Sequence, residues 1–538
     1  MINIVSLYFS LNEWFSQLTS YGLAVLRKFD KNMSTIYIEN ENQITFLNQA
    51  IEKKPDLVVV FVSYHSYDLL QKSCNYLRER LNNSVYITLC HNIASGLAEK
   101  MLYEFDSINS CIVGEFEKPL YELCNLLLNG NSPESCSSLS YIKNGSFVQN
   151  RPSNLLPLSE IPYPEREAFN TDTRYFAMLG SRGCEGNCTF CDRNMLFRSF
   201  MRSTPRYREV SDIVNEIDYL VDKYNCKFVS FNDSTFCSSQ NIICRLDQLY
   251  KVLFPKKYWV QFLICLRSEQ ISLPVIYQIK NLMTVGLGKV YIGLESFNKF
   301  DLELYGKISD VQTNICAISN LKLLEHATDN YILNIGYGFI NFNPYSTLSG
   351  LKNNLVELDR NNINIDPYIV TTKLSLNCFA PLTKRIDKDG LLYKSLEDMS
   401  VKELMNRRLN YSFVNHNVQD AFDILSFCKK YLNYKNVQGY EFIRNRYLHF
   451  LGYDSILERY DAMYQERASV VHKYTYNLCN YIFSSADNKI KKLSNSTNLC
   501  DEFLNRYKPV DDGLISIKKR LVIELSKIDE LIFNKLNH

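Results

Sequence analysis

Three of the 17 cysteines stand close together in the segment 180–192, which reads GSRGCEGNCTFCD. Cys184, Cys188 and Cys191 follow a C-x3-C-x2-C spacing directly after a predicted strand. Three thiolates on one short loop can hold an iron–sulfur cluster, because the loop can wrap the cube while its backbone amides donate to the sulfurs. Three thiolates for four irons leave one iron open, and that iron can chelate the amino and carboxylate groups of a ligand.

A zinc site and a chance spacing are the alternative interpretations of this loop. Structural zinc usually has a fourth Cys or His close by, whereas the next candidate after Cys191 is Cys226, 35 residues further on. The spacing, the preceding strand and the barrel-like pattern of the surrounding segment together favour the cluster.

Composition places the chain among globular proteins and excludes several classes. Its 538 residues are 46% hydrophobic and 22% charged, with room for several domains. A net charge of +2 provides no overall field for nucleic acid or an anionic membrane, so we expect neither as a partner. No apolar run reaches the length of a membrane span, the N-terminus lacks a basic leader, and the cysteines are odd in number and widely spread. These features predict a cytoplasmic protein.

Residues 1–130 alternate short apolar runs with amphipathic helical segments, which predicts an α/β domain with a doubly wound, Rossmann-like parallel sheet. The expected strands are Ile2–Leu7, Ser34–Glu39, Leu57–Ser63, Ser84–Cys90 and Ser110–Val113. Residues 131–171 are rich in Ser, Asn and Pro and are predicted to be a linker.

The alternation resumes over 172–385 and predicts a (β/α)6 partial TIM barrel, in which functional residues follow the strands. The expected strands are Tyr175–Leu179, Lys227–Asn232, Trp259–Ile264, Lys289–Leu294, Ile332–Phe339 and Tyr368–Leu376. Strand signals fade over 386–538, which is predicted to form a mainly helical C-terminal domain.

The barrel segment resembles the radical SAM superfamily. The three cysteines match its ligand motif, and Phe190 matches the aromatic residue that precedes the third cysteine. Four further segments are similar to family motifs, namely FNDSTF (231–236), GLES (293–296), YGK (305–307) and GFINFNPYST (338–347). The resemblance implies a [4Fe–4S] cluster that cleaves S-adenosylmethionine (SAM) to a 5′-deoxyadenosyl radical, and a flavodoxin or ferredoxin as electron donor.

The same resemblance implies that Asp233, Glu295 and Ser296 contact SAM or the substrate. The two acidic residues also fit a solvated strand end or a helix cap. Arg267, just after the third barrel strand, can pair with a carboxylate of SAM or the substrate, and an ordinary structural ion pair is an equal alternative. No residue is assigned a catalytic role from the sequence.

The N-terminal domain resembles the cobalamin (B12)-binding domain of a subgroup of this superfamily, through the segments KPDLVVV (54–60) and DSINSCIVGEFEKPLYEL (106–123). Many relatives end the fourth strand with a Gly-Gly pair, whereas this chain has Leu-Cys-His-Asn at 89–92. His91 is therefore a candidate residue of a cobalamin site, and the alternative is that it has a structural role only.

Three functions remain open at this stage. The first is a cobalamin-dependent C-methyltransferase acting on a natural product or peptide. The second is a radical SAM epimerase, cyclase or rearrangement enzyme whose cobalamin domain is degenerate, because the glycines are missing. The third is a non-catalytic, cluster-bearing binding protein that recruits a partner through the tyrosine-rich C-terminal region. A small-molecule or peptide substrate is expected for either enzyme.

Overall fold

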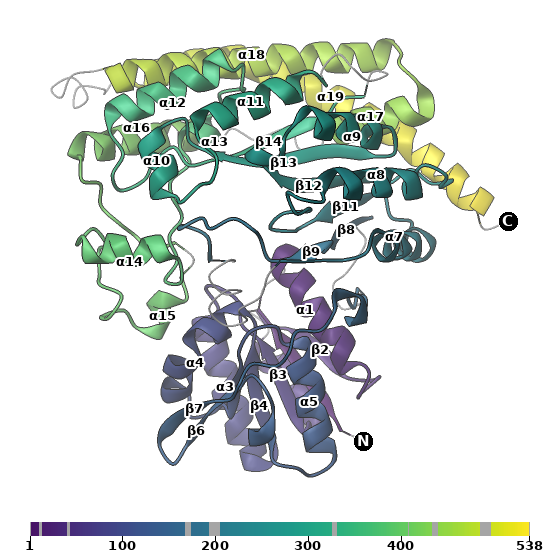
Figure 1. The fold of residues 1–538 in the computed structure, drawn as a ribbon, viewed down its shortest axis with the longest axis vertical. Helices are drawn as coiled ribbons and strands as arrows, with labels where there is room; N and C mark the ends of the chain where they lie inside the picture. The colour runs from purple at the N-terminus through teal and green to yellow at the C-terminus, as the bar shows by residue number, and fades with distance from the viewer. Residues whose placement is uncertain are drawn as a thin grey trace. The chain divides into compact units, whose positions relative to one another are not determined.

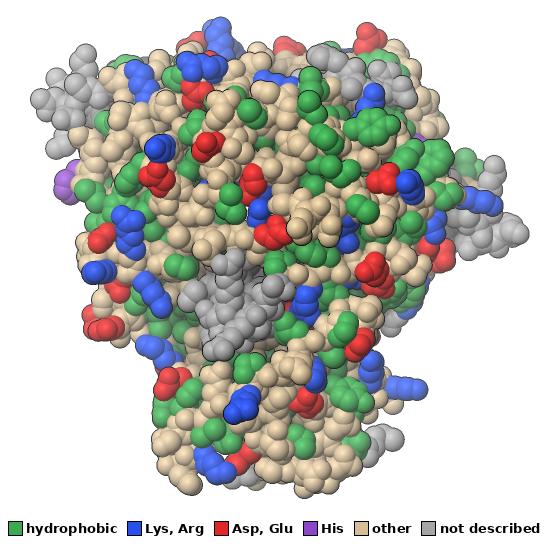
Figure 2. All heavy atoms as spheres, in the orientation of Figure 1, with side chains coloured by type: hydrophobic (Ala, Val, Ile, Leu, Met, Phe, Trp, Pro, Cys, Tyr) green, Lys and Arg blue, Asp and Glu red, His purple; other side chains and the backbone are tan. Residues whose placement is uncertain are grey.

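A computed structural model describes residues 2–9, 13–39, 43–166, 174–192, 205–324, 331–406, 408–432, 440–484 and 496–536. The chain forms two compact units. Unit 1 comprises Met1–Glu216, Asn232–Ser234 and Ser375–Asn410, and unit 2 comprises Ile217–Phe231, Thr235–Leu374 and Tyr411–His538. Of the helices described, none combines the length and apolarity needed to cross a membrane. Basic and acidic side chains are interspersed on the face drawn in Figure 2, in keeping with the net charge of +2.

Unit 1 contains a seven-stranded sheet of order β2-β1-β3-β4-β5-β6-β7, in which β1 to β5 are parallel. Its parallel strands are β1 (Ile4–Tyr8), β2 (Ser34–Tyr37), β3 (Leu57–Phe61), β4 (Tyr86–Cys90) and β5 (Ser110–Ile112). All five predicted strands are confirmed, with ends that differ by at most two residues. Every side chain of β3 is buried, as expected for a central parallel strand covered on both faces.

Helices pack against this sheet, namely α1 (Glu13–Leu26), α2 (Gln43–Glu52), α3 (Tyr67–Leu81), α4 (Asn92–Glu104) and α5 (Glu117–Leu128). Helices α1, α3, α4 and α5 are labelled beside its strands in Figure 1. Helix α1 packs beside α5, and α2 packs beside α3. The pattern is the predicted doubly wound domain, in which functional groups gather beyond the carboxyl ends of the strands.

The segment predicted as a linker contains two further strands, so that part of the prediction was wrong. Strands β6 (Leu139–Lys143) and β7 (Ser146–Gln149) form an antiparallel hairpin that extends the sheet beyond β5. Asn144 and Gly145, at the turn, both have positive φ, of 52° and 77°. An Asn-Gly pair between two short strands is a strong hairpin signal, and it outweighs the polar composition of the surrounding segment.

The described part of unit 1 has further elements outside this sheet. They are β8 (Tyr175–Met178), the antiparallel pair β9 (Ser181–Arg182) and β10 (Arg206–Tyr207), the start of α7 (Val210–Tyr224), and the short helices α14 (Pro381–Lys388) and α15 (Val401–Leu404). Three short 3-10 turns lie at Asn82–Ser84, Pro133–Ser135 and Leu158–Glu160. The domain boundary predicted between 385 and 386 falls inside α14.

Unit 2 contains four parallel strands that pair in sequence order. They are β11 (Phe228–Phe231), β12 (Gln261–Arg267), β13 (Leu287–Glu295) and β14 (Asn334–Phe339). The helices between and after them are α8 (Ile242–Leu253), α9 (Leu273–Thr284), α10 (Lys299–Leu304), α11 (Val311–Lys322) and α12 (Leu348–Arg360), with a 3-10 turn at Ser268–Gln270. The predicted barrel strands at these four places are confirmed.

The sixth predicted barrel strand, Tyr368–Leu376, was wrong. Its first residues belong to helix α13 (Pro367–Val370), and Lys373 makes a single parallel bridge to Phe342. Asp366 caps this helix by accepting hydrogen bonds from the amides of Tyr368 and Ile369, each at 2.8 Å, and Pro367 occupies its first position. A capping carboxylate and a proline favour a helix start over a strand.

The C-terminal region is helical, as predicted. It consists of α16 (His416–Leu432), α17 (Tyr440–Leu451), α18 (Ser455–Ser484) and α19 (Ser496–Leu536). Helices α18 and α19 pack along one another, and α12 packs against α18 (Figure 1). Asn445 of α17 exchanges two hydrogen bonds with the backbone of Ile332, just before β14, so α17 is fastened at the amino end of that strand.

Candidate functional site

The cysteine loop leaves unit 1's short strand β9 through a tight turn. Gly183 has φ +93°, and a Cβ atom there would lie 3.2 Å from the Cα atom of Pro205, so the turn requires glycine. All three cysteines of the loop are partly exposed. The amide of Gly186 donates to Sγ of Cys184 at 3.3 Å. Helix α14 supports the loop, because the amide of Leu382 donates to the carbonyl oxygen of Thr189 at 2.8 Å.

These thiols differ from the buried cysteines of the same unit. Burial raises the pKa of the Cys74 and Cys124 thiols to about 12, as expected of inert core residues. In the described part of the chain, no three His, Cys, Asp or Glu side chains gather closely enough to hold a single metal ion. The loop thus offers three separate, accessible thiols and a backbone N–H directed at one sulfur, and this donor set fits an iron–sulfur cluster. Phe190, between the second and third cysteines, is also partly exposed.

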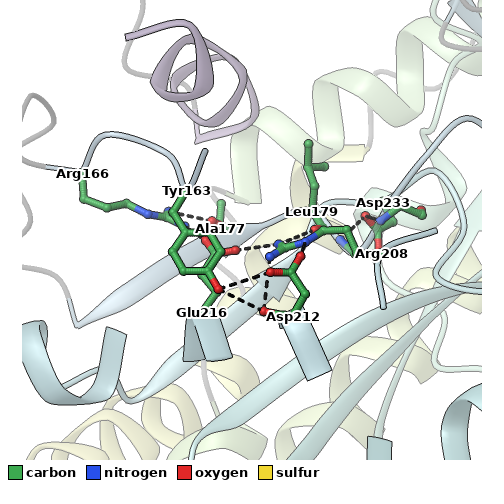
Figure 3. A network of polar contacts seen from close by, with 10 residues as sticks. Tyr163, Arg166, Ala177, Leu179, Arg208, Asp212, Glu216 and Asp233 are labelled. Carbon is green, nitrogen blue, oxygen red and sulfur yellow. Dashed lines mark hydrogen bonds and ion pairs between the residues drawn. The ribbon is translucent and has the colours of Figure 1, made fainter. Parts of the chain in front are cut away.

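Asp233, which follows β11 in sequence, holds the base of the cysteine loop. Its Oδ1 atom accepts hydrogen bonds from the amides of Gly180 and Ser181, both at 2.9 Å, and its side chain is 2% exposed. Figure 3 shows Asp233 beside the end of β8. The structure shows one oxygen of this carboxylate bound to backbone amides of the loop, and its predicted contact with SAM or the substrate stays a prediction.

Sequence reasoning missed a group of buried ion pairs behind the same strand end (Figure 3). Arg208 donates to the carbonyl oxygen of Leu179 at 3.0 Å and to Glu216 at 2.6 Å. Arg166 donates to the carbonyl oxygen of Ala177 at 2.7 Å and to the other oxygen of Glu216 at 2.8 Å. The guanidinium groups therefore fix the carbonyls that end β8. Arg166 and Glu216 lie 50 residues apart in sequence, so no local spacing indicated that pair.

In unit 2, Glu295 ends β13 in a left-handed conformation, with φ +68°. Lys307 donates to the carbonyl oxygen of Gly293 at 2.9 Å, and its Nζ lies 3.9 Å from Oε1 of Glu295. Burial raises the pKa of Glu295, and the charge of Lys307 opposes that rise. Two segments that the sequence linked only by resemblance, GLES and YGK, thus meet through this lysine.

Ser296 and Arg267 are engaged by protein groups. The hydroxyl of Ser296 is fully buried and lies 2.9 Å from Asp301 and 3.1 Å from Asn354, within the turn that leads to α10. Arg267 forms an ion pair with Glu269 at 2.9 Å, which is the structural alternative considered for it. A contact of either residue with SAM or the substrate stays a prediction.

The strand face that carries Glu295 also presents Tyr291, a residue that is 42% exposed. Alternate residues of a strand share a face, and Tyr291 lies opposite Gly336 of β14. A Cβ atom at Gly336 would lie 2.7 Å from the ring of Tyr291 and 3.1 Å from Cε of Lys289. The glycine therefore leaves space for a phenol and an ammonium group side by side on this face. Sequence reasoning missed both side chains.

His91 lies where β4 ends and α4 begins, in unit 1. Its φ of 95° and ψ of 171° belong to a region that is almost exclusive to glycine. The ring is 3% exposed and packs against Phe116. Burial lowers the pKa of His91 to about 3, which keeps the imidazole neutral at pH 7. The side chain is thus directed into the protein, and a contact of His91 with cobalamin stays a prediction.

Comparisons with known sequences give distant relatives. No family model matches the chain. It is 24% identical over 329 residues to a Pyrococcus horikoshii protein named as an uncharacterized methyltransferase, a match that covers 58% of this chain and 68% of that protein. It is 22% identical over 377 residues to 4′-phospho-dehydrooxetanocin synthase of Priestia megaterium, a match that covers 65% of this chain and 48% of that enzyme.

Solved structures extend the likeness over the whole chain. The cobalamin-dependent SAM radical enzyme OxsB, with aqua-cobalamin bound, matches 98% of this chain and 84% of its own at a TM-score of 0.68 and 17% identity. The radical SAM methyltransferase TsrM of Kitasatospora setae, with cobalamin and a [4Fe–4S] cluster bound, matches 77% of this chain and 84% of its own at a TM-score of 0.58 and 14% identity. The chain therefore has the fold of the cobalamin-dependent radical SAM enzymes.

Proposed function

We propose that this protein is a radical SAM enzyme and, more specifically, a cobalamin-dependent C-methyltransferase. The observation that carries the proposal is the set of three accessible thiols, Cys184, Cys188 and Cys191, on one loop whose base is fixed by the buried carboxylate of Asp233. These thiols would hold a [4Fe–4S] cluster, which would supply the electron that cleaves SAM to methionine and a 5′-deoxyadenosyl radical able to abstract hydrogen from a substrate carbon.

Each part of the chain has its own task in this proposal. The thiols would hold three irons, and Asp233 together with the Arg208–Glu216 pair keeps the loop base and the end of β8 in place. Glu295, held near Lys307, is proposed to bind SAM or the substrate. The doubly wound domain is proposed to bind cobalamin beyond its carboxyl edge, where doubly wound sheets place their ligands.

A cellular setting and partners follow from this chemistry. The cluster requires a low-potential electron for each cleavage, so a flavodoxin or ferredoxin is the proposed donor. We propose a cytoplasmic enzyme acting on a small molecule or a peptide.

The first test is anaerobic reconstitution with iron and sulfide, followed by measurement of iron content and of 5′-deoxyadenosine formed from SAM after reduction. Replacing Cys188 with Ala is expected to lower cluster content severely and to abolish this turnover, because a cluster ligand is lost. Cys244→Ala, at an exposed cysteine of α8, is the matched control and is expected to behave as the wild type. Full turnover in Cys188→Ala, or no turnover in the wild type, would refute the radical mechanism and favour a binding protein.

A second test separates methyl transfer from rearrangement. One relative is named as a synthase and not as a methyltransferase, so an enzyme with this fold whose product carries no new methyl group is the alternative. Cobalamin is offered during reconstitution, and the absorbance spectrum is read after desalting. Corrin retained at about one per chain supports cobalamin binding, and a search for methylated product then decides the reaction. A cluster spectrum without corrin bands would refute the cobalamin-dependent assignment.

A further inference from the structure

The base of the cysteine loop is a two-residue ladder with an unusual charge arrangement. In the antiparallel pair β9–β10, Arg182 lies directly opposite Arg206, and Ser181 lies opposite Tyr207. The chain leaves this ladder just before Cys184 and re-enters it at Arg206, so the ladder closes the cysteine segment. Like charges directly opposite each other on paired strands repel, and they require a neutralising partner.

Two carboxylates neutralise this pair, Glu115 in the loop before α5 and Glu117 at the first position of that helix. Glu115 makes an ion pair with Arg182 at 3.0 Å through one oxygen and binds Arg206 through the other. Glu117 accepts from Arg182 at 2.6 Å. The side chains of Arg182 and Glu117 are only 6% and 3% exposed. An arginine guanidinium stays protonated in proteins, so this buried side chain carries a full positive charge that the two carboxylates balance.

The same loop is joined to the turn that carries His91. The amide of Gly114 donates to Oγ of Ser95 at 2.9 Å, and that hydroxyl donates to the carbonyl oxygen of His91 at 3.0 Å. Glu115 follows Gly114 directly, and Glu117 is the first residue of α5. A continuous set of polar contacts therefore runs from the carboxyl edge of the doubly wound sheet to the base of the cysteine loop, entirely within unit 1.

We propose that Glu115 and Glu117 are positioning residues for the iron–sulfur cluster, fastening both ends of its loop to the carboxyl edge of the N-terminal sheet and compensating the fixed charge of Arg182. This inference rests on the proposed function, because it requires the loop to hold a cluster. Arg182 stands two residues before Cys184. In the protein interior its charge acts on nearby groups with little screening, and the sum of charges around a cluster sets its reduction potential.

The test is the midpoint potential of the reconstituted cluster in the full-length protein, measured by redox titration with electron paramagnetic resonance. Glu117→Gln leaves Arg182 undercompensated, so the potential is expected to rise. Arg182→Gln removes the positive charge, so the potential is expected to fall. The double variant is expected to lie between the two single variants. Glu134→Gln, which breaks the exposed ion pair with Lys143 on the same unit, is the matched control and should leave the potential unchanged.

Shifts of opposite sign distinguish a charge effect from general loosening of the loop, which would move both single variants the same way. Shifts of the same sign, or unchanged potentials at full iron content, would overturn the inference. If Glu117→Gln loses iron, the iron content of Glu117→Asp is measured next, because this variant keeps the negative charge. Iron retained by the Asp variant supports the proposal, and equal loss from both variants overturns it. A wild-type protein that forms no cluster would instead overturn the proposed function.

Discussion

The strongest pH prediction concerns His91, whose buried imidazole must stay neutral in the folded chain. The ordinary pKa of histidine is 6.5, and burial lowers that of His91 to about 3. Below pH 6.5 the unfolded chain binds a proton that the folded chain does not, so the free energy of unfolding falls as the pH falls through this window. One pKa unit corresponds to about 1.4 kcal/mol, so this residue alone removes about 1.4 kcal/mol per pH unit, approaching about 5 kcal/mol near pH 3.

The assay is urea unfolding followed by circular dichroism between about pH 7 and about pH 4, with wild type and His91→Gln compared at each pH. Glutamine has a similar size and does not titrate. The free energy of unfolding of the variant is therefore expected to increase steadily relative to that of the wild type as the pH falls. The matched control is His65→Gln, because His65 lies in the same unit, also has positive φ, and is exposed. Parallel stability curves for wild type and His91→Gln over this range would refute a buried neutral imidazole.

Three further predictions concern packing and hydrogen bonds, each measured by chemical denaturation. Asp233→Ala is expected to lower the free energy of unfolding by about 1–3 kcal/mol for each of the two buried amides that it leaves without an acceptor, and to lower iron retention. An unchanged free energy of unfolding together with unchanged iron retention would contradict its role at the loop base. Gly336→Ala is expected to lower the free energy of unfolding by about 1–3 kcal/mol, because the added methyl group overlaps the ring of Tyr291. The loss is expected to be much smaller in a Tyr291→Ala background, and equal losses in both backgrounds would argue against that contact. Asp366→Ala is expected to cost about 1 kcal/mol through loss of the cap of α13, and a neutral effect would contradict the capping geometry.

Sequence reasoning succeeded where the signal is local. The cysteine spacing, the buried apolar run of β3 and the strand ends that carry Asp233 and Glu295 are all visible within a few residues. The Asn144–Gly145 turn was an equally local signal, but the polar composition around it obscured the hairpin. Asp366 and Pro367 likewise marked a helix start inside a segment whose apolar residues resembled a strand.

What the sequence could not provide depends on contacts between distant segments. Glu216 joins Arg166 and Arg208 from separate elements, and Arg182 finds its partners more than sixty residues away. Such pairs form only after the sheets have brought their strand ends together. For the same reason, the role of Asp233 as an acceptor for backbone amides required the folded loop, because a strand-end carboxylate alone does not indicate what it binds.

The hairpin β6–β7 has a consequence for how the folded chain avoids aggregation. A parallel sheet that ended at β5 would expose that strand's unpaired backbone groups, which can template association with another chain. Pairing with β6 covers them and moves the sheet's edge to β7, a strand of four residues with exposed Ser146 and Gln149 at its ends. The opposite edge, β2, is also only four residues long. Both borders of the sheet are therefore too short to support extended pairing between molecules, which favours a chain that stays dispersed at high concentration.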